Sequence, residues 1–430
     1  MASNCQRGFL THAPCPMPHA PEEYTVNRMR PIRETITLEA ARDLIDAAIR
    51  PIERTERVRI DTASGRVVAR AVEAQADVPP FARAAMDGYA VRAADTFGAS
   101  TQDPRALTWV ETVFTGQVPA RPVGAHQCTE IATGAPVPDG SDAVVMVEDT
   151  EKQPDHTVRV FSPVYPGQNL TRQGADIRAG QSVLLPGDVL NPSRIGAVAA
   201  LGIIDVEVYA QPRVAILSTG NEVVDPGQPL KPGHIYDINK FTLGAVLREH
   251  GACPVPYPTA PDNVPDLTRA IEACLAEDVI LFSGGSSVGE RDLILDVVER
   301  MGDVLFHGIA VKPGKPTLFG TITGKPVFGM PGYPTSCLSN AYMLLIGPIR
   351  RLARLPEWAP RIARLPLGQR VVSTTGRHQF YTVRIVDGQA MPAFKASGDI
   401  TSMSQADGYI EIPAQVDVVE KGEPVDVKLF

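Results

Sequence analysis

The feature of this sequence that most constrains its fold is an alternation of strand-like and helix-like segments that starts at Arg213. Short apolar runs typical of buried strands alternate with stretches whose apolar residues recur at helical spacing. The predicted strands are 214–218, a short piece near 255, and 279–283; the predicted helices are 240–250, 264–276 and 293–301. This pattern predicts a mostly parallel sheet with helices on both faces and ligands at the carboxyl ends of its strands.

The next segments extend the same unit. Residues 311–330 add strand-like pieces, and a long helix is expected over 335–355, directly after Pro334. Proline is well tolerated in the first turn of a helix, which supports a helix start at this point. We therefore interpret residues 211–355 as one α/β domain.

At 430 residues the chain is long enough for about three domains or more. Residues 58–163 contain short β-like pieces separated by Pro and Gly and predict a β-rich domain, while residues 356–430 predict a small C-terminal β-barrel domain with a hairpin at Asp387-Gly388. The predicted fold class is therefore α/β plus β, in several domains.

Two further segments are assigned by their length and composition. A helix is expected over 36–52, capped by Thr35 or Thr37, and residues 164–210 are too few for a core of their own. We expect them to pack together, so that 31–57 and 164–210 form one discontinuous linker domain. Residues 1–30 are rich in Pro and His and are interpreted as a poorly ordered extension.

Composition excludes several classes of protein. A net charge of −8 provides no basic surface for nucleic acid. The longest nearly unbroken apolar run, 195–204, is about half the length of a membrane span, so no membrane partner is expected. The six cysteines are scattered without a C-x-x-C pair, which predicts reduced thiols, a cytoplasmic location and no zinc site.

Three glycine-rich loops between Ser283 and Pro334 predict an anion-binding site. The loop 283–289 follows a predicted strand, 312–316 reads Lys-Pro-Gly-Lys-Pro, and 331–334 reads Pro-Gly-Tyr-Pro. Glycines allow backbone amides to approach an anion, and the two lysines add fixed positive charge. A surface turn is the alternative for the lysine-containing loop.

Four other features are weaker on their own residues. Asp292 lies beside the first loop and suggests a bridging Mg²⁺, although an acidic residue there also suits a helix N-terminus. Ser218 to Glu222 follows a strand and is equally well read as a turn. Asp87-Gly88 and Thr133-Gly134 would be ordinary turns in most proteins.

Taken together, the motifs resemble the MoeA family, the molybdopterin molybdenumtransferases of molybdenum cofactor biosynthesis. The resemblance covers nearly all of residues 32–430. Six motifs occur in the family's order: Ala-Met-Asp-Gly-Tyr-Ala, Ala-Thr-Gly-Ala-Pro, Gly-Ala-Asp-Ile, Ser-Thr-Gly-Asn-Glu, Ser-Gly-Gly-Ser-Ser-Val-Gly-Glu-Arg-Asp and Lys-Pro-Gly-Lys-Pro. The Pro-Gly-Tyr-Pro sequence resembles archaeal-type members.

The resemblance implies an elongated homodimer of four-domain subunits. Its α/β domain would be MogA-like and bind molybdopterin, and the active cleft would lie between the α/β domain of one subunit and the β-rich domain of the other. The implied reaction inserts molybdate into adenylylated molybdopterin with Mg²⁺-dependent release of AMP. Tungstate is a possible alternative substrate.

The resemblance also implies site residues by matching position. The expected catalytic residues are Asp87, Thr133, Asp176, Glu222, Asp262, Asp292, Lys312 and Lys315. The expected substrate contacts are Arg172, Thr219, Gly220, Asp237, Ser283, Gly284, Gly285, Ser286, Ser287, Gly289, Pro331, Gly332, Tyr333 and Ser397. Glu222 and Asp292 are the expected Mg²⁺ ligands.

Two positions depart from the common family pattern, and two other functions stay open. Asn221 stands where many members have Asp, and Tyr333 where many have Asn, so metal handling could differ. A molybdopterin adenylyltransferase resembles the α/β domain alone, but would not need Asp87 or Thr133. A non-catalytic peptide-binding scaffold of the same fold is the other alternative.

Overall fold

The computed structural model describes residues 34–284 and 293–430. The predicted extension 1–30 lies outside the described residues, as do Gly285, Ser286, Ser287, Gly289 and Asp292 of the glycine-rich loop. The described helices are all too short or too polar to cross a bilayer.

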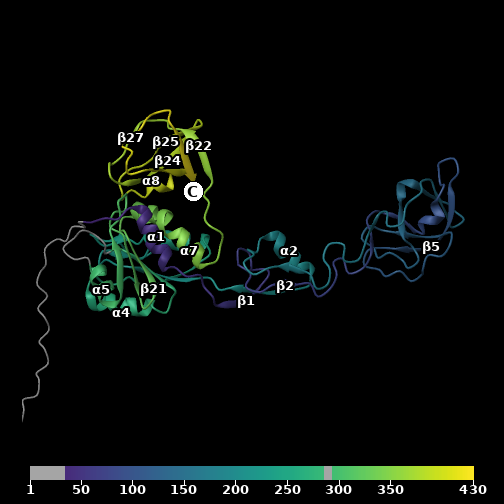
Figure 1. The fold of residues 1–430 in the computed structure, drawn as a ribbon, viewed down its shortest axis with the longest axis horizontal. Helices are drawn as coiled ribbons and strands as arrows, with labels where there is room; N and C mark the ends of the chain where they lie inside the picture. Colours follow the sequence, from purple (N-terminus) through teal and green to yellow (C-terminus); the bar gives the residue numbers. More distant parts are fainter. Residues whose placement is uncertain (1–33, 285–292) are drawn as a thin grey trace, which may run out of the picture.

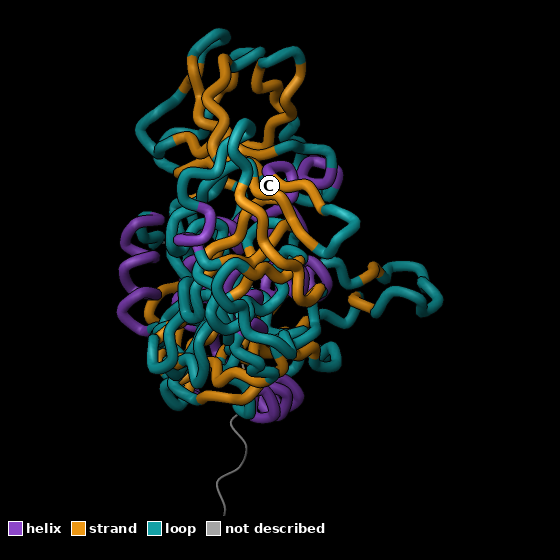
Figure 2. Tube along the Cα trace, turned by 90° about the vertical axis from the view of Figure 1, so that its right-hand side faces the viewer, coloured by secondary structure: helices purple, strands orange, loops and turns teal. Residues whose placement is uncertain are grey.

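The molecule is elongated (Figure 1). The α/β domain and the C-terminal strands lie at one end, the sheet that contains β5 lies at the other, and a narrow linker with β1, β2 and α2 joins them. Seen along the long axis, the C-terminal strands are stacked above the α/β domain (Figure 2). The β-rich domain is therefore held away from the rest of its own chain.

The α/β domain is built on a six-stranded sheet, and the predicted strands are confirmed. Its order is β16 (Cys253–Pro256), β13 (Arg213–Ser218), β17 (Val279–Ser283), β21 (Lys325–Met330), β20 (Leu318–Ile322) and β18 (Asp303–His307). The first four strands are mutually parallel, and β20 is antiparallel to both of its neighbours. β16, which contains two prolines, lies at an edge, where a missing N–H is tolerated.

Helices cover both faces of this sheet because successive strand residues point to opposite sides. Val214 and Ile216 of β13 face a core with α3 (Asn239–Glu249) and the chain's last long helix, whereas Ala215 and Leu217 face α4 (Val264–Cys274) and α5 (Leu293–Met301). The helix expected over 335–355 is present as α6 (Pro334–Asn340), a π-helical turn (Ala341–Leu345) and α7 (Ile346–Leu352). Pro348 has no N–H to donate to residue 344, which accounts for an irregular turn before it.

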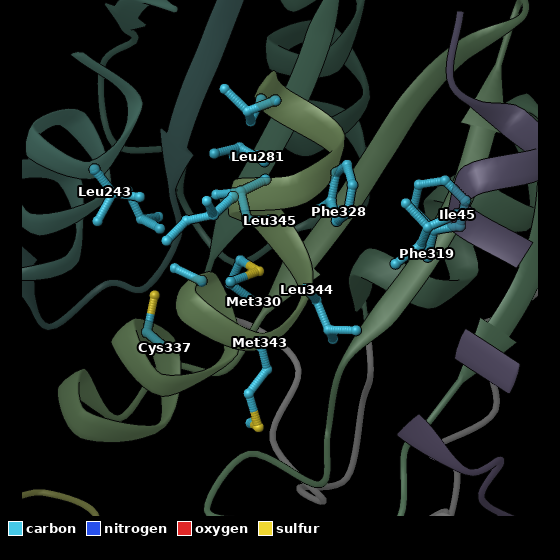
Figure 3. Close-up of a cluster of buried hydrophobic side chains, with 14 of the residues drawn as sticks. Ile45, Leu243, Leu281, Phe319, Phe328, Met330, Cys337, Met343, Leu344 and Leu345 are labelled. Atoms are coloured by element: carbon cyan, nitrogen blue, oxygen red, sulfur yellow. The ribbon is translucent and has the colours of Figure 1, made fainter. Parts of the chain in front are cut away.

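The first helix packs differently from the prediction. α1 (Leu38–Ala48) starts after Thr37, whose Oγ1 accepts a hydrogen bond from the Ala40 amide at 3.2 Å. Its buried Ile45 belongs to the core that contains Phe319 and Phe328 of the α/β sheet (Figure 3). The expected packing of this helix against residues 164–210 is therefore wrong, because its apolar stripe covers a large aromatic sheet face that the linker does not offer.

The linker has a small core of its own. β1 (Thr55–Arg59) pairs with β12 (Asp205–Tyr209), β2 (Val72–Glu73) pairs with β11 (Ser182–Leu184), and α2 (Pro192–Ala200) packs beside them. The buried residues of this core include Val68, Val72, Leu190, Val198 and Val206. The linker is thus formed by residues that precede the β-rich domain in the sequence and by residues that follow it.

The β-rich domain has a six-stranded sheet. Its order is β7 (Ala143–Met146), β4 (Gly88–Val91), β6 (Gln127–Ile131), β5 (Arg105–Val113), β9 (Thr157–Val160) and β8 (Thr150–Lys152). Short 3₁₀ turns lie at Ala93–Thr96 and Val147–Asp149, and β3 (Arg83–Ala84) pairs with β10 (Leu170–Thr171) at the linker side.

The C-terminal domain also has a six-stranded sheet, and one of its strands comes from the α/β domain. The order is β19 (Val311–Lys312), β24 (His378–Val386), β26 (Gly408–Ile412), β28 (Pro424–Leu429) and β22 (Ile362–Pro366), with β25 (Gln389–Pro392) paired to β24. β23 (Val371–Val372), β27 (Val418–Val419) and α8 (Thr401–Ser404) complete it. The hairpin at Asp387-Gly388 is confirmed, with φ of 49° and 72° at its two turn residues.

Candidate active site

A cleft of about 1300 Å³ lies where parallel strands predict one, beyond the carboxyl ends of β13, β17 and β21. Its walls are the loops that follow these strands, the segment 311–316, and residues Arg377, Ser397 and Gly398 of the C-terminal domain. The α/β and C-terminal domains therefore share it.

Most of the sequence-predicted residues of the α/β and C-terminal domains line this cleft. They are Thr219, Gly220, Glu222, Asp237, Asp262, Ser283, Gly284, Lys312, Lys315, Pro331, Gly332, Tyr333 and Ser397. Sequence reasoning missed Arg377, Asn239 and Ser336, which also line it. Arg377 stands in a Thr-Thr-Gly-Arg turn that carries no local signal for a site; only the contact between the two domains brings it to the cleft.

The Lys-Pro-Gly-Lys-Pro loop is held from two sides. β19 pairs in parallel with β24, and Lys312 Nζ donates a hydrogen bond to Thr374 Oγ1 at 2.7 Å. On the other side, Asn340 Nδ2 donates to the Gly314 carbonyl at 2.9 Å. Gly314 has a φ of 104°, and a Cβ there would lie 2.4 Å from Asn340 Oδ1. Only glycine fits this position, so the spacing of the two lysines depends on it.

The loops after β13 and β17 are also in close contact. Gly284 has a φ of 104°, and an added Cβ would lie 2.6 Å from the Thr219 carbonyl oxygen. Asn239 Nδ2 donates to the Gly332 carbonyl at 2.8 Å and joins the third loop to the start of α3. Glycines thus allow three separate loops to meet at one point.

Four buried polar atoms on the cleft side have no hydrogen-bond partner in the described part of the chain. They are Ser218 Oγ, Thr219 Oγ1, Asp237 Oδ2 and Asn239 Oδ1. Buried polar groups in native proteins are nearly always paired, so a cluster of unpaired ones indicates a polar ligand.

Two carboxylates of the cleft influence each other. Desolvation of Asp262, together with the negative charge of Glu222, raises the pKa of the Asp262 carboxyl. Asn221 Oδ1 accepts a hydrogen bond from the Asp262 amide at 3.3 Å. An aspartate at 221 would add a third negative charge here.

These residues fit Mg²⁺ only if the ion is shared with a ligand. Across residues 34–284 and 293–430, no three His, Cys, Asp or Glu side chains are grouped as a metal site. Mg²⁺ usually binds through one or two carboxylates together with phosphate oxygens and water. Glu222 and Asp262 supply such a pair, while the expected ligand Asp292 lies outside the described residues.

The four expected site residues before position 200 do not line this cleft. Asp87 and Thr133 are exposed in the β-rich domain, where the Thr133 amide donates to Asp87 Oδ1 at 2.7 Å. Hydrogen bonds from the Thr133 backbone and side chain lower the pKa of the Asp87 carboxyl. Arg172 is exposed nearer the linker, and Asp176 lines a separate hollow of about 480 Å³ beside β11 and α2.

Comparison with protein families gives one consistent result. Three family models match the chain: the MoeA N-terminal region (domain I and II) over residues 36–202, the probable molybdopterin binding domain over 215–351, and the MoeA C-terminal region (domain IV) over 364–430. Between them they span the linker, the β-rich domain, the cleft and the C-terminal sheet.

Individual proteins agree with these models. Molybdopterin molybdenumtransferase 2 of Mycobacterium tuberculosis is 35% identical over 395 residues, covering 88% of this chain and 95% of the relative. The molybdopterin molybdenumtransferase of Haemophilus influenzae is 32% identical over 404 residues, covering 92% and 98%. The crystal structure of a molybdopterin biosynthesis MoeA protein from Pyrococcus horikoshii superposes with a TM-score of 0.80 at 39% identity and covers 92% of this chain and 99% of that one.

The predicted resemblance is therefore confirmed along almost the whole chain, by sequence and by fold independently. Of the motifs that carried it, Ser-Thr-Gly-Asn-Glu and Lys-Pro-Gly-Lys-Pro line the cleft of the α/β domain, together with Ser283 and Gly284. The chain belongs to the MoeA family.

Proposed function

We propose that this protein is a molybdopterin molybdenumtransferase that inserts molybdate into adenylylated molybdopterin and releases AMP. The observation that carries the proposal is the meeting of Lys312, Lys315 and Arg377 with the carboxylates of Glu222 and Asp262 in one cleft. A site that contains both cationic and acidic side chains suits a substrate that carries phosphate groups and reacts with a second anion.

The cationic side of the cleft would bind the oxyanion and the leaving phosphate. Release of AMP requires cleavage of a phosphoanhydride bond by an oxygen nucleophile, and negative charge then develops on the departing AMP. Fixed ammonium and guanidinium groups placed beforehand stabilise that charge without reorganising. The hydrogen bond from Lys312 to Thr374 and the close contact of Gly314 with Asn340 hold one such group in place.

The carboxylate side would hold Mg²⁺ together with the substrate. Mg²⁺ supplies charge neutralisation on phosphate oxygens when it is bound. The chain's own part is to offer Glu222 and Asp262 beside the unpaired polar atoms of Ser218, Thr219 and Asp237, which would accept or donate hydrogen bonds to the pterin.

Asp87 and Thr133 would act in the cleft of a second copy of the chain. They belong to the β-rich domain, which the linker holds away from the α/β domain of the same chain (Figure 1). A homodimer with two-fold symmetry would place each β-rich domain over the other subunit's cleft and give two equal sites. Arg172 and Asp176 would lie at the edge of that contact.

The deciding experiment mixes the purified protein with adenylylated molybdopterin, Mg²⁺ and either molybdate or tungstate, and follows AMP. We expect AMP release that depends on the oxyanion and is lost with EDTA. AMP release without any oxyanion dependence would contradict the proposal. In a separate reaction, product formed from ATP and free molybdopterin would identify an adenylyltransferase. Binding of the substrate without turnover would identify a scaffold.

A further inference from the structure

The loop 225–234 borders the cleft through Leu230, and paired strands close its base. It joins β14 (Val223–Val224) to β15 (Ile235–Tyr236), which pair in parallel. Leu230, near its middle, lines the cleft with 49% of its surface exposed. From β15, Tyr236 Oη donates a hydrogen bond to the carbonyl of Gln228 in the loop at 3.0 Å.

One buried ammonium group contacts both this loop and a carboxylate that lines the cleft. The side chain of Lys240 is 9% exposed, and its Nζ lies 2.6 Å from Asp225 Oδ1 at the start of the loop. The same Nζ lies 3.4 Å from Asp237 Oδ2, and the Lys240 amide donates to Asp237 Oδ1 at 3.0 Å. Asp225 belongs to the loop, whereas Asp237 lines the cleft.

Asp237 depends on this lysine because of its own burial. Its side chain is 2% exposed, and its Oδ2 has the Lys240 ammonium group as an ion-pair partner but accepts no hydrogen bond in the described part of the chain. Burying a carboxylate to this extent is costly unless an opposite charge lies beside it. The base of the loop reinforces the arrangement, since the Asp237 amide donates to the Val224 carbonyl at 2.8 Å.

We propose that Lys240 is a positioning residue that couples the loop 225–234 to Asp237, so that one ammonium group holds both the wall of the cleft and the carboxylate that receives the substrate. The proposal rests on the proposed function for the identity of that substrate, whose pterin ring offers N–H donors to a carboxylate. Lys240 acts through Asp237 and the loop, so it serves binding more than the chemical step.

The first experiment does not require activity. Hydrogen exchange followed by mass spectrometry is compared for the wild-type protein, Lys240→Met and Asp225→Asn. Asp225 is 55% exposed, so its variant releases the loop with little risk to folding. We expect about tenfold faster exchange of the amides of 225–236 in both variants, as loss of one hydrogen bond to a charged group implies.

Lys325→Met is the matched control. Lys325 is also a partly buried lysine of the α/β domain, but its Nζ donates to the Leu275 and Glu277 carbonyls and does not line the cleft. It is expected to leave exchange in 225–236 unchanged. If the amides of 225–236 exchange at the wild-type rate in both Lys240→Met and Asp225→Asn, Lys240 does not hold the loop and the proposal is overturned.

The second experiment separates binding from chemistry. In the AMP-release assay, Lys240→Met is expected to raise KM for adenylylated molybdopterin about tenfold with kcat nearly unchanged, because uniform binding is lost. Asp225→Asn is expected to raise KM less, since Asp237 keeps its partner, and Lys240→Arg is expected to restore KM. An equal KM in Lys240→Met and wild type, or a loss confined to kcat, would overturn the positioning role. Absence of AMP release by the wild type would contradict the proposed function alone. The hydrogen-exchange experiment would still decide whether Lys240 holds the loop.

Discussion

The cleft of the α/β domain and the Asp87–Thr133 pair of the β-rich domain are both expected parts of one active site, yet they are built very differently. The cleft collects loops from three parallel strands and a turn of the C-terminal domain, and its Lys-Pro-Gly-Lys-Pro loop is held by hydrogen bonds from two sides. The pair in the β-rich domain is exposed and joined by a hydrogen bond of 2.7 Å. The cleft is thus organised within one chain, whereas the pair would need a partner surface to take part in the proposed site.

The two regions also hold their carboxylates in opposite ways. In the cleft, desolvation and the charge of Glu222 raise the pKa of Asp262. In the β-rich domain, hydrogen bonds from Thr133 lower the pKa of Asp87 and keep it ionised. The cleft therefore disfavours further negative charge unless a cation is bound, whereas the β-rich domain presents an ionised carboxylate.

The largest effect is expected from the cationic side of the cleft. Lys312→Ala should lower kcat for AMP release by about 100- to 1000-fold, the usual loss when one preorganised electrostatic contact to developing charge is removed. Steady-state assay of the purified variant measures it. Lys421→Ala removes an exposed lysine from the turn before β28 and should leave activity unchanged. Near wild-type kcat in Lys312→Ala would show that the cleft does not perform the transfer.

Mixed dimers test whether the two regions act together across subunits. Asp87→Asn and Lys315→Ala chains, each inactive alone, are dissociated and reassembled in equal amounts. About a quarter of wild-type activity should return, because half of the random dimers are mixed and each has one intact site of two. A mixture of wild-type chains with Asp87→Asn/Lys315→Ala double-variant chains calibrates the exchange. If activity stays at zero, the site is built within one chain.

A smaller effect is expected from the glycine that spaces the two lysines. Gly314→Ala introduces a Cβ 2.4 Å from Asn340 Oδ1 at a φ of 104° and should destabilise the domain by roughly 3 kcal/mol. Gly324→Ala is the matched control, since its φ of 79° is also left-handed but its Cβ meets nothing within 4 Å. That change should cost about 1 kcal/mol. Thermal unfolding compares the two, and equal shifts would mean that the loop is free to adjust.

The smallest effect concerns pH. Because the pKa of Asp262 is raised on folding, its contribution to stability is present below its ordinary pKa and is lost as the pH rises through the folded value. Asp262→Asn should therefore stabilise the protein at pH 7, by less than about 1 kcal/mol because the side chain is exposed, and not at pH 3. Asp87, with its lowered pKa, should show no such gain on Asp87→Asn.

Thermal midpoints in EDTA at both pH values test this difference between the two carboxylates. Chelation keeps any divalent cation from masking the repulsion between Asp262 and Glu222. A gain for Asp87→Asn equal to that for Asp262→Asn at pH 7 would remove the electrostatic contrast between the two regions.

Much of the fold could be predicted from local patterns. The alternation after Arg213 predicted the strands and helices of the α/β domain, and the hairpin at Asp387-Gly388 was placed by its turn residues. The packing of α1 was predicted wrongly, because a helical stripe such as that of Ile45 shows that a face is buried and not against what. Arg377 escaped prediction for a related reason, since its turn is ordinary until the C-terminal domain docks.

The family and the place of the α/β part of the site could be predicted from the sequence alone. Parallel strands bring their carboxyl ends to one edge, so the motifs that follow β13, β17 and β21 had to converge once the alternation was read. The tertiary fold was needed to show that Arg377 completes the cleft and that Lys240 bridges Asp225 and Asp237. It also shows that the β-rich domain, to which Asp87 belongs, lies at the other end of the molecule from the α/β domain. Those relations depend on contacts between segments that are far apart in the sequence, and the local pattern of apolar residues does not encode such contacts.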